Sequence, residues 1–102
     1  MILNIKERLL IMQMLPDSGS ICDMLDIMEI IKKIRVEQEE KDRVSYCESK
    51  GVVTWNVSAD TGKEVEFKHE EISILKAAVK KIDEEKKVNM SNLDICLKIN
   101  SL

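Results

Sequence analysis

The chain has 102 residues, of which 44% are hydrophobic and 34% are charged, and its formal net charge is −3. This length fits one domain built around a single hydrophobic core. Thirteen Ile, nine Leu, eight Val and six Met supply ample aliphatic surface, while three Gly and one Pro are few. The composition therefore excludes a disordered chain, a collagen-like repeat and a disulfide scaffold.

The sequence pattern also favours a protein of the cytoplasm. The most apolar segment, residues 21–34, is interrupted by five charged residues and falls short of the roughly 18 apolar residues that cross a bilayer. Glu7 lies within the first turns, and no small-residue cleavage site follows, which argues against a signal peptide. Successive cysteines are separated by 25 and 49 residues, unlike the close pairs of zinc or redox motifs. We expect reduced and mostly packed thiols, with Cys47 on a loop as the exposed exception, and we expect no metal and no cofactor.

Two helices are predicted at the beginning of the chain. The first covers about residues 4–15, with Asn4 as its N-terminal cap and a stripe of Ile5, Leu9 and Met12. Pro16 and Gly19 predict a short turn after it. The second helix covers about residues 20–35, begins with a Ser-x-x-Asp capping box, and carries more apolar positions than one partner helix needs.

The middle of the chain changes from a helical to a strand pattern. Residues 37–45 form a polar run with acids at its start, which favours a short helix over an extension of the second one. Residues 52–57 and 64–68 then alternate apolar with polar side chains, as half-buried strands do. The intervening segment contains Gly62, so we expect these two strands to pair as a hairpin.

Two further helices complete the prediction, over about residues 70–87 and 91–100. The first has glutamates at its start and lysines towards its end, which suits the helix dipole, and the second begins with Ser91 and Asp94 in a capping pattern. The expected order is helix, helix, short helix, β-hairpin, helix, helix. We therefore predict a single compact domain over residues 1–102, of the α+β class and predominantly helical.

Few side chains suggest catalysis. His69 is the one histidine, and a nucleophile such as a cysteine would need it within hydrogen-bond reach. An enzyme centred on His69 is accordingly the third hypothesis for function, and we predict that the chain is not an enzyme. The Gly62-Lys63 pair lacks the preceding glycine of a phosphate-binding loop and leads into a strand, so turn chemistry explains it.

The predicted element order resembles a winged helix, in which a third helix reads DNA and a hairpin touches the backbone. This makes a nucleic-acid-binding regulator that uses the hairpin lysines Lys50, Lys63 and Lys68 the alternative hypothesis. The charges disfavour it, because residues 37–43 hold four acids against two bases. Acidic faces that imitate DNA are conceivable, but a net charge of −3 is small for such a mimic.

The leading hypothesis is a small interaction or regulatory protein that binds a protein partner or associates with itself. Methionine side chains are flexible and serve both irregular cores and adaptable binding surfaces. Four of them lie in the first two predicted helices, which hold more apolar surface than the core requires. The candidate partner surface comprises Met12, Met14, Met24 and Met28.

Three stretches also resemble small proteins of about 100 residues that recur in bacteriophages and prophages. They are residues 4–10 followed by Leu15-Pro16, residues 53–56 together with 59–67, and residues 75–87. Because that group has no established activity, the resemblance implies no functional residue. It implies a phage or prophage origin, and with it the cytoplasm of a bacterial host.

Overall fold

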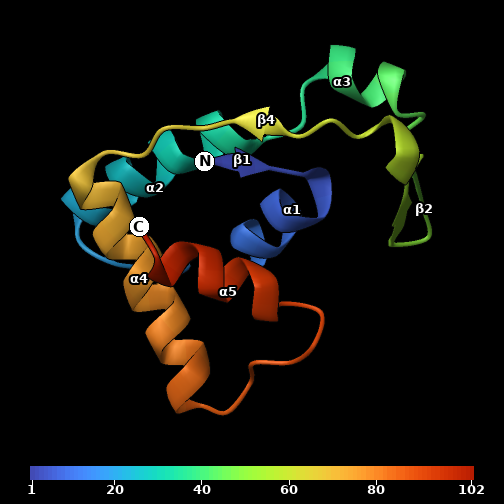
Figure 1. The fold of residues 1–102 in the computed structure, drawn as a ribbon. Helices are drawn as coiled ribbons and strands as arrows, with labels where there is room; N and C mark the ends of the chain where they lie inside the picture. Colours follow the sequence, from blue (N-terminus) through green and yellow to red (C-terminus); the bar gives the residue numbers. More distant parts are fainter.

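Five α-helices, four short strands and one 3-10 turn make up the computed structural model, which describes all residues 1–102 (Figure 1). The predominantly helical α+β class is confirmed. In chain order the elements are β1 (Ile2–Leu3), α1 (Ile5–Met14), α2 (Ile21–Ile34), α3 (Gln38–Arg43), β2 (Cys47–Ser49), β3 (Val52–Thr54), the turn η1 (Val57–Ala59), β4 (Lys63–Glu64), α4 (His69–Glu84) and α5 (Leu93–Asn100). None of these helices is both long and apolar enough to cross a membrane.

The predicted N-terminal cap Asn4 of α1 and the predicted capping box of α2 are both present, and the α1 cap is also a capping box. The Asn4 side chain accepts the backbone N–H of Glu7 at 2.8 Å, and the Glu7 carboxylate accepts the Asn4 N–H at 3.0 Å. Ser20 and Asp23 make the same reciprocal pair at α2. These caps satisfy N–H groups that have no partner within the helix, so the local sequence marks where both helices begin.

The strand pairing differs from the prediction. Residues 52–57 and 64–68 do not form a hairpin with each other, because β3 pairs with β2 and β4 pairs with β1 (Figure 1). In the hairpin that does form, Lys50 and Gly51 are the two loop residues, and both have positive φ, as the tight turn between twisted strands requires. Trp55, just after β3, stacks on Tyr46 rather than facing Val65.

The β4 strand is directed to the N-terminus of the chain by the segment before it. The Asp60 carboxylate accepts the N–H of Ile5, the first residue of α1, at 2.9 Å. Strand β4 then pairs antiparallel with β1, and the N–H of Val65 donates to the carbonyl of Met1 at 2.8 Å. A contact across 55 residues is invisible to sequence periodicity, which explains the wrong hairpin.

Helix α4 ends earlier, and helix α5 begins later, than predicted. Helix α4 ends at Glu84, because Lys86 adopts positive φ and the N–H of Lys87 donates back to the carbonyl of Ile82. Helix α5 begins at Leu93, and Ser91 is not its cap. The side chains of Asn89 and Asn92 instead accept each other's backbone N–H groups at 3.0 and 2.8 Å.

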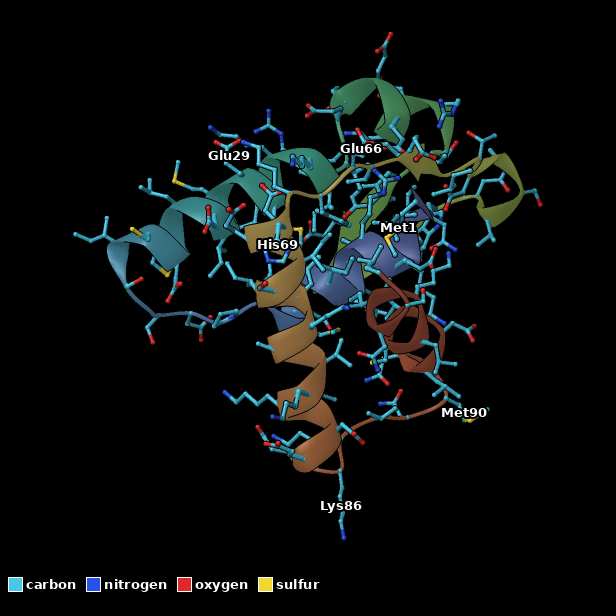
Figure 2. All side chains as sticks on the ribbon, turned by 60° about the vertical axis from the view of Figure 1, so that its left-hand side comes forward. Met1, Glu29, Glu66, His69, Lys86 and Met90 are labelled. Atoms are coloured by element: carbon cyan, nitrogen blue, oxygen red, sulfur yellow. The ribbon has the colours of Figure 1, made fainter.

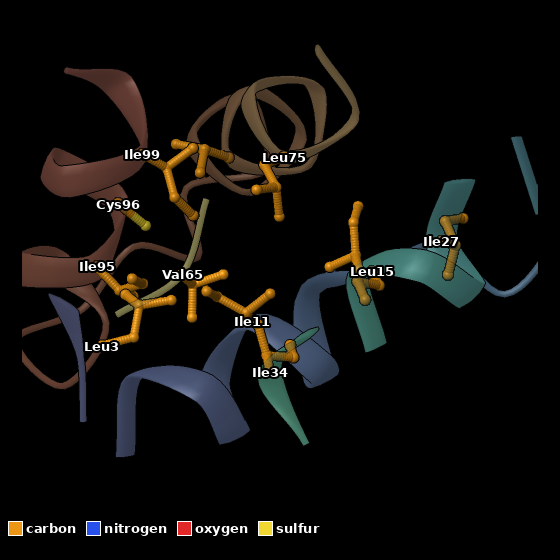
Figure 3. Close-up of a cluster of buried hydrophobic side chains, with 12 residues drawn as sticks. Leu3, Ile11, Leu15, Ile27, Ile34, Val65, Leu75, Ile95, Cys96 and Ile99 are labelled. Atoms are coloured by element: carbon orange, nitrogen blue, oxygen red, sulfur yellow. The ribbon is translucent and has the colours of Figure 1, made fainter. Parts of the chain in front are cut away.

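A single hydrophobic core joins four helices with the β1–β4 sheet (Figure 3). Twelve buried residues form it: Leu3, Ile11, Leu15, Ile27, Ile30, Ile34, Val65, Leu75, Val79, Ile95, Cys96 and Ile99. The predicted α1 stripe is correct at Ile5, which is buried, but wrong at Met12, which is exposed, and Leu9 is only half-buried. Ile11 and Leu15 face the core instead. Arg8 lies on that buried face, and a charged residue at this position interrupts the apolar pattern by which the buried face would have been predicted.

Candidate functional site

Helix α2 is apolar on two opposite faces. Its inner face, made of Ile27, Ile30 and Ile34, is buried in the core and packs towards α4. The outer face carries Ile21, Leu25 and Met28, whose exposed fractions are 82%, 55% and 51%. These residues follow each other at intervals of four and three, so they lie along one line of the helix. We call this line the α2 outer stripe.

The edges of the α2 outer stripe differ in character. Along one edge Met24 and Ile31 are half-buried and pack against the core cluster. Along the other edge Cys22 and Glu29 are exposed, and Figure 2 shows Glu29 on the outer side of α2. One edge is therefore anchored to the core, and the opposite edge is polar and open to solvent.

Charge is distributed unevenly along the same segment. Asp17, Asp23 and Asp26 occupy the turn before α2 and the first half of the helix, whereas Lys32, Lys33 and Arg35 gather at its end. Lys32 pairs with Glu29 at 3.3 Å, and both side chains are about half exposed. Lys33 is tied to α4 through the carboxylate of Glu71 at 2.5 Å. Basic side chains thus gather near the end of α2, whereas Asp17 and Asp23 line a cleft on the side of α2 that faces α4.

The four candidate methionines do not form one surface. Met28 belongs to the α2 outer stripe, and Met24 lies along its edge. Met12 is exposed on α1, and Met14 lines a cleft. The sequence prediction chose methionines and missed Ile21 and Leu25, which are the most exposed apolar residues of α2.

That cleft, of about 740 Å³, lies between the end of α1, the α1–α2 turn, α4 and the α4–α5 connection. Its apolar lining includes Leu10, Met14 and Ile74, and charged groups such as Asp17 and Lys81 are at its rim. His69 does not line it and is exposed at the first residue of α4 (Figure 2). The cleft therefore brings together neither the histidine nor a cysteine, and no group of three metal-binding side chains occurs in the structure.

The β-hairpin that the winged-helix hypothesis requires is not the one found in the structure. The hairpin that was expected to act as a wing is replaced by β2–β3, which carries Lys50 at its tip. Lys63 lies instead in β4 beside the N-terminus, and Lys68 precedes α4. The three lysines that this hypothesis placed on one hairpin lie on separate segments.

The three cysteine thiols do not form a reactive site. All three cysteines are free, with Cys22 and Cys47 exposed and Cys96 buried. Burial raises the pKa of the Cys96 thiol, and the charge of Asp83 raises it further, which keeps this thiol protonated and unreactive. The predicted exposure of Cys47 is confirmed, whereas the expectation that the other thiols are packed is wrong for Cys22.

Searches of protein-family models, of curated proteins and of solved structures give no match to this chain. They add nothing to the resemblance to phage and prophage proteins.

Proposed function

We propose that this chain is a small, non-enzymatic interaction or regulatory protein of phage type that binds a protein surface through the α2 outer stripe. The single observation that carries this proposal is the alignment of Ile21, Leu25 and Met28 on one exposed line. Scattered exposed apolar residues are normal on a soluble protein. No other element carries more than one large exposed apolar residue, and two further ones lie outside the elements: Ile2, Met12, Val52, Val57 and Leu97, with Met90 and Leu102.

The stripe fits a helix-docking mode of recognition. An amphipathic helix presents anchors at intervals of three and four residues to a complementary apolar surface. Fully burying one such side chain contributes about 1.5–3 kcal/mol, so three partly exposed anchors supply a useful fraction of a binding energy. The flexible thioether of Met28 suits a contact that adapts to its partner. The free cysteines support a reducing site of action, which we take to be the cytoplasm.

Two matched variants test this proposal in a native extract. Leu25→Asp places a charge in the stripe, whereas Leu97→Asp changes a leucine of nearly equal exposure, 58%, on α5. In size-exclusion chromatography of an extract from cells that encode the protein, the wild type and Leu97→Asp should elute in a species larger than the monomer. Leu25→Asp should elute as the monomer with an unchanged circular dichroism spectrum. Wild type that elutes only as a monomer would contradict the proposal.

A further inference from the structure

We propose that the cleft between α1 and α4 is a binding site for small amphiphilic cations, compounds in which an apolar body carries a protonated amine. The cleft shares no residue with the α2 outer stripe, so this inference does not depend on the proposed function. It comes from the size of the cleft, from its uncovered apolar walls and from the balance of charge around it.

The cleft has the size and the lining of a small-molecule site. Its volume of about 740 Å³ falls within the range of roughly 300–1,000 Å³ that such sites occupy. Ile74, Ala77 and Ala78 lie three and four residues apart on α4, so they form one wall. Ala77 is exposed, and its small side chain leaves the middle of this wall open. Leu10 and Met14 of α1 also line the cleft and are only half-buried, so apolar surface remains uncovered.

Carboxylates outnumber ammonium groups among the unpaired charges that line the cleft. Glu85 and Lys87 pair with each other at 3.1 Å, so their charges cancel. Asp17, Asp23 and Lys81 make no ion pair within the chain. Two carboxylates against one ammonium give these three groups a net negative charge, which attracts a cationic ligand.

The two aspartates are held in place more firmly than the lysine. The Asp23 carboxylate accepts the N–H of Ser20 through one oxygen at 3.3 Å, which leaves the other oxygen for a ligand. Asp17 follows Pro16, whose fixed φ stiffens the turn. Lys81 is exposed and carries its ammonium on a flexible four-carbon stem, so it can turn towards solvent. A bound cation therefore meets the carboxylates at little cost from the lysine.

An amphiphilic cation matches both the charge and the apolar walls. Its amine donates to the carboxylates of Asp17 and Asp23, while its apolar body covers Met14 and Ile74. A polar cation such as a free polyamine would leave the apolar walls in contact with water. An apolar anion would meet the net negative charge. The class of ligand follows from these two exclusions.

Three probes with the same alkyl tail test the preference for a cation. We titrate n-octylammonium, n-octanol and n-octanoate into the full chain below the concentrations at which they form micelles, and follow backbone amides by ¹⁵N NMR. n-Octylammonium should bind most tightly and shift the amides of Met14 and Ala77, but not those of Leu25 and Met28. No binding of n-octylammonium, equally tight binding of n-octanoate, or shifts confined to the α2 outer stripe would overturn the inference.

Two charge variants should move the affinity for n-octylammonium in opposite directions. Asp17→Asn removes a carboxylate and should raise the Kd about threefold, as expected for one exposed ion pair. Lys81→Gln removes a repelling ammonium and should lower the Kd by a similar factor. Asp42→Asn is the control, because Asp42 is exposed on α3 and does not line the cleft. Equal effects of Asp17→Asn and Asp42→Asn would contradict the assignment of the carboxylates.

Filling the open wall tests the apolar part of the site. Ala77→Leu places a larger side chain in the cleft and should raise the Kd for n-octylammonium about tenfold or more. Leu25→Ser changes the α2 outer stripe without adding charge and should leave this Kd unchanged. Circular dichroism spectra of both variants should match that of the wild type. If Leu25→Ser weakens the binding and Ala77→Leu does not, the cleft is not the site, and the proposed function of the stripe is unaffected.

Discussion

The guanidinium of Arg8 on α1 and the carboxylate of Glu40 on α3 form a two-point ion pair. Nη1 donates to Oε1 at 2.8 Å, and Nη2 donates to Oε2. Arg8 is fully buried, whereas α3 itself buries no residue. An ionic contact therefore holds this polar helix against the body of the protein, and the alignment of both donors with both acceptors makes the pair a strong one.

Removing Arg8 should cost much more stability than removing an exposed arginine. Arg8→Ala leaves Glu40 without its partner in a largely buried position, and the expected loss is about 3 kcal/mol. Arg35, which pairs with Glu37 at 2.8 Å on the surface, is the matched control. Arg35→Ala should change the free energy of unfolding by less than about 1 kcal/mol. Urea unfolding of both variants measures the difference, and equal losses would contradict a structural role for the buried pair.

The carboxylate of Glu71 should make stability depend on pH. Burial raises its pKa, but hydrogen bonds from Lys33 Nζ and from the Lys68 N–H, together with both lysine charges, outweigh burial and hold the pKa below its usual range. The unfolded chain therefore binds this proton more readily than the folded one. The stabilisation is complete above the ordinary glutamate pKa of about 4.3 and is lost as the pH falls through the lowered value.

Glu71→Gln tests this linkage. The variant should lose stability at neutral pH and should show a smaller decrease in its free energy of unfolding between neutral and acidic pH than the wild type. Urea unfolding at a series of pH values measures both curves. If the variant keeps the full wild-type slope, Glu71 is not the source of the pH dependence.

The Asp60 carboxylate should stabilise the start of α1 from a distant loop. It accepts the N–H groups of Ile5 at 2.9 Å and Gly62 at 3.1 Å. Asp60→Ala leaves both donors without this partner, and the expected loss is about 1–2 kcal/mol in the free energy of unfolding. Asp17→Ala, at an exposed aspartate without such hydrogen bonds, should be nearly neutral to the stability of the monomer. Similar losses in the two variants would count against the Asp60 cap.

Gly51 and Gly62 have the same φ angle but different surroundings, so alanine at each position separates the cost of backbone strain from the cost of a steric clash. Gly51 and Gly62 both have φ of +77°, so an alanine at either position costs about 1 kcal/mol or more. A Cβ atom at residue 62 would lie 2.6 Å from Cγ2 of Ile2, whereas nothing lies within 4 Å of one at residue 51. Gly62→Ala should therefore lower the melting temperature more than Gly51→Ala. The reverse order would contradict the close pairing of this loop with β1.

Local signals were readable in the sequence, and long-range ones were not. Asn4 and Ser20 cap helices through residues three positions away, so their roles are visible in a short window of sequence. The pairing of β4 with β1 and the capping of α1 by Asp60 join segments more than fifty residues apart, and no local period records them. Lys86 adopts positive φ without being glycine, so the end of α4 was not marked, and in the Lys50-Gly51 turn only the second of the two positive-φ residues is a glycine.

The candidate surface was foreseen only in outline. The surplus of apolar residues in α2 was evident from its stripe, which was wider than one partner helix needs. Which of those residues face outward depends on how α2 packs against α4, and Ile21 and Leu25 could equally have faced the core. Arg8 shows the converse case, in which a charged residue is buried because a partner 32 residues away neutralises it.

The central claim is that the α2 outer stripe is a contact surface, and site-specific photo-crosslinking in living cells tests it most directly. A photoreactive amino acid is placed at residue 25 in one variant and, as the control, at residue 97 in another, two sites of similar exposure on different helices. We predict a discrete crosslinked adduct from residue 25 and none from residue 97, with mass spectrometry identifying the partner. No adduct from residue 25, or equal adducts from both sites, would contradict the claim.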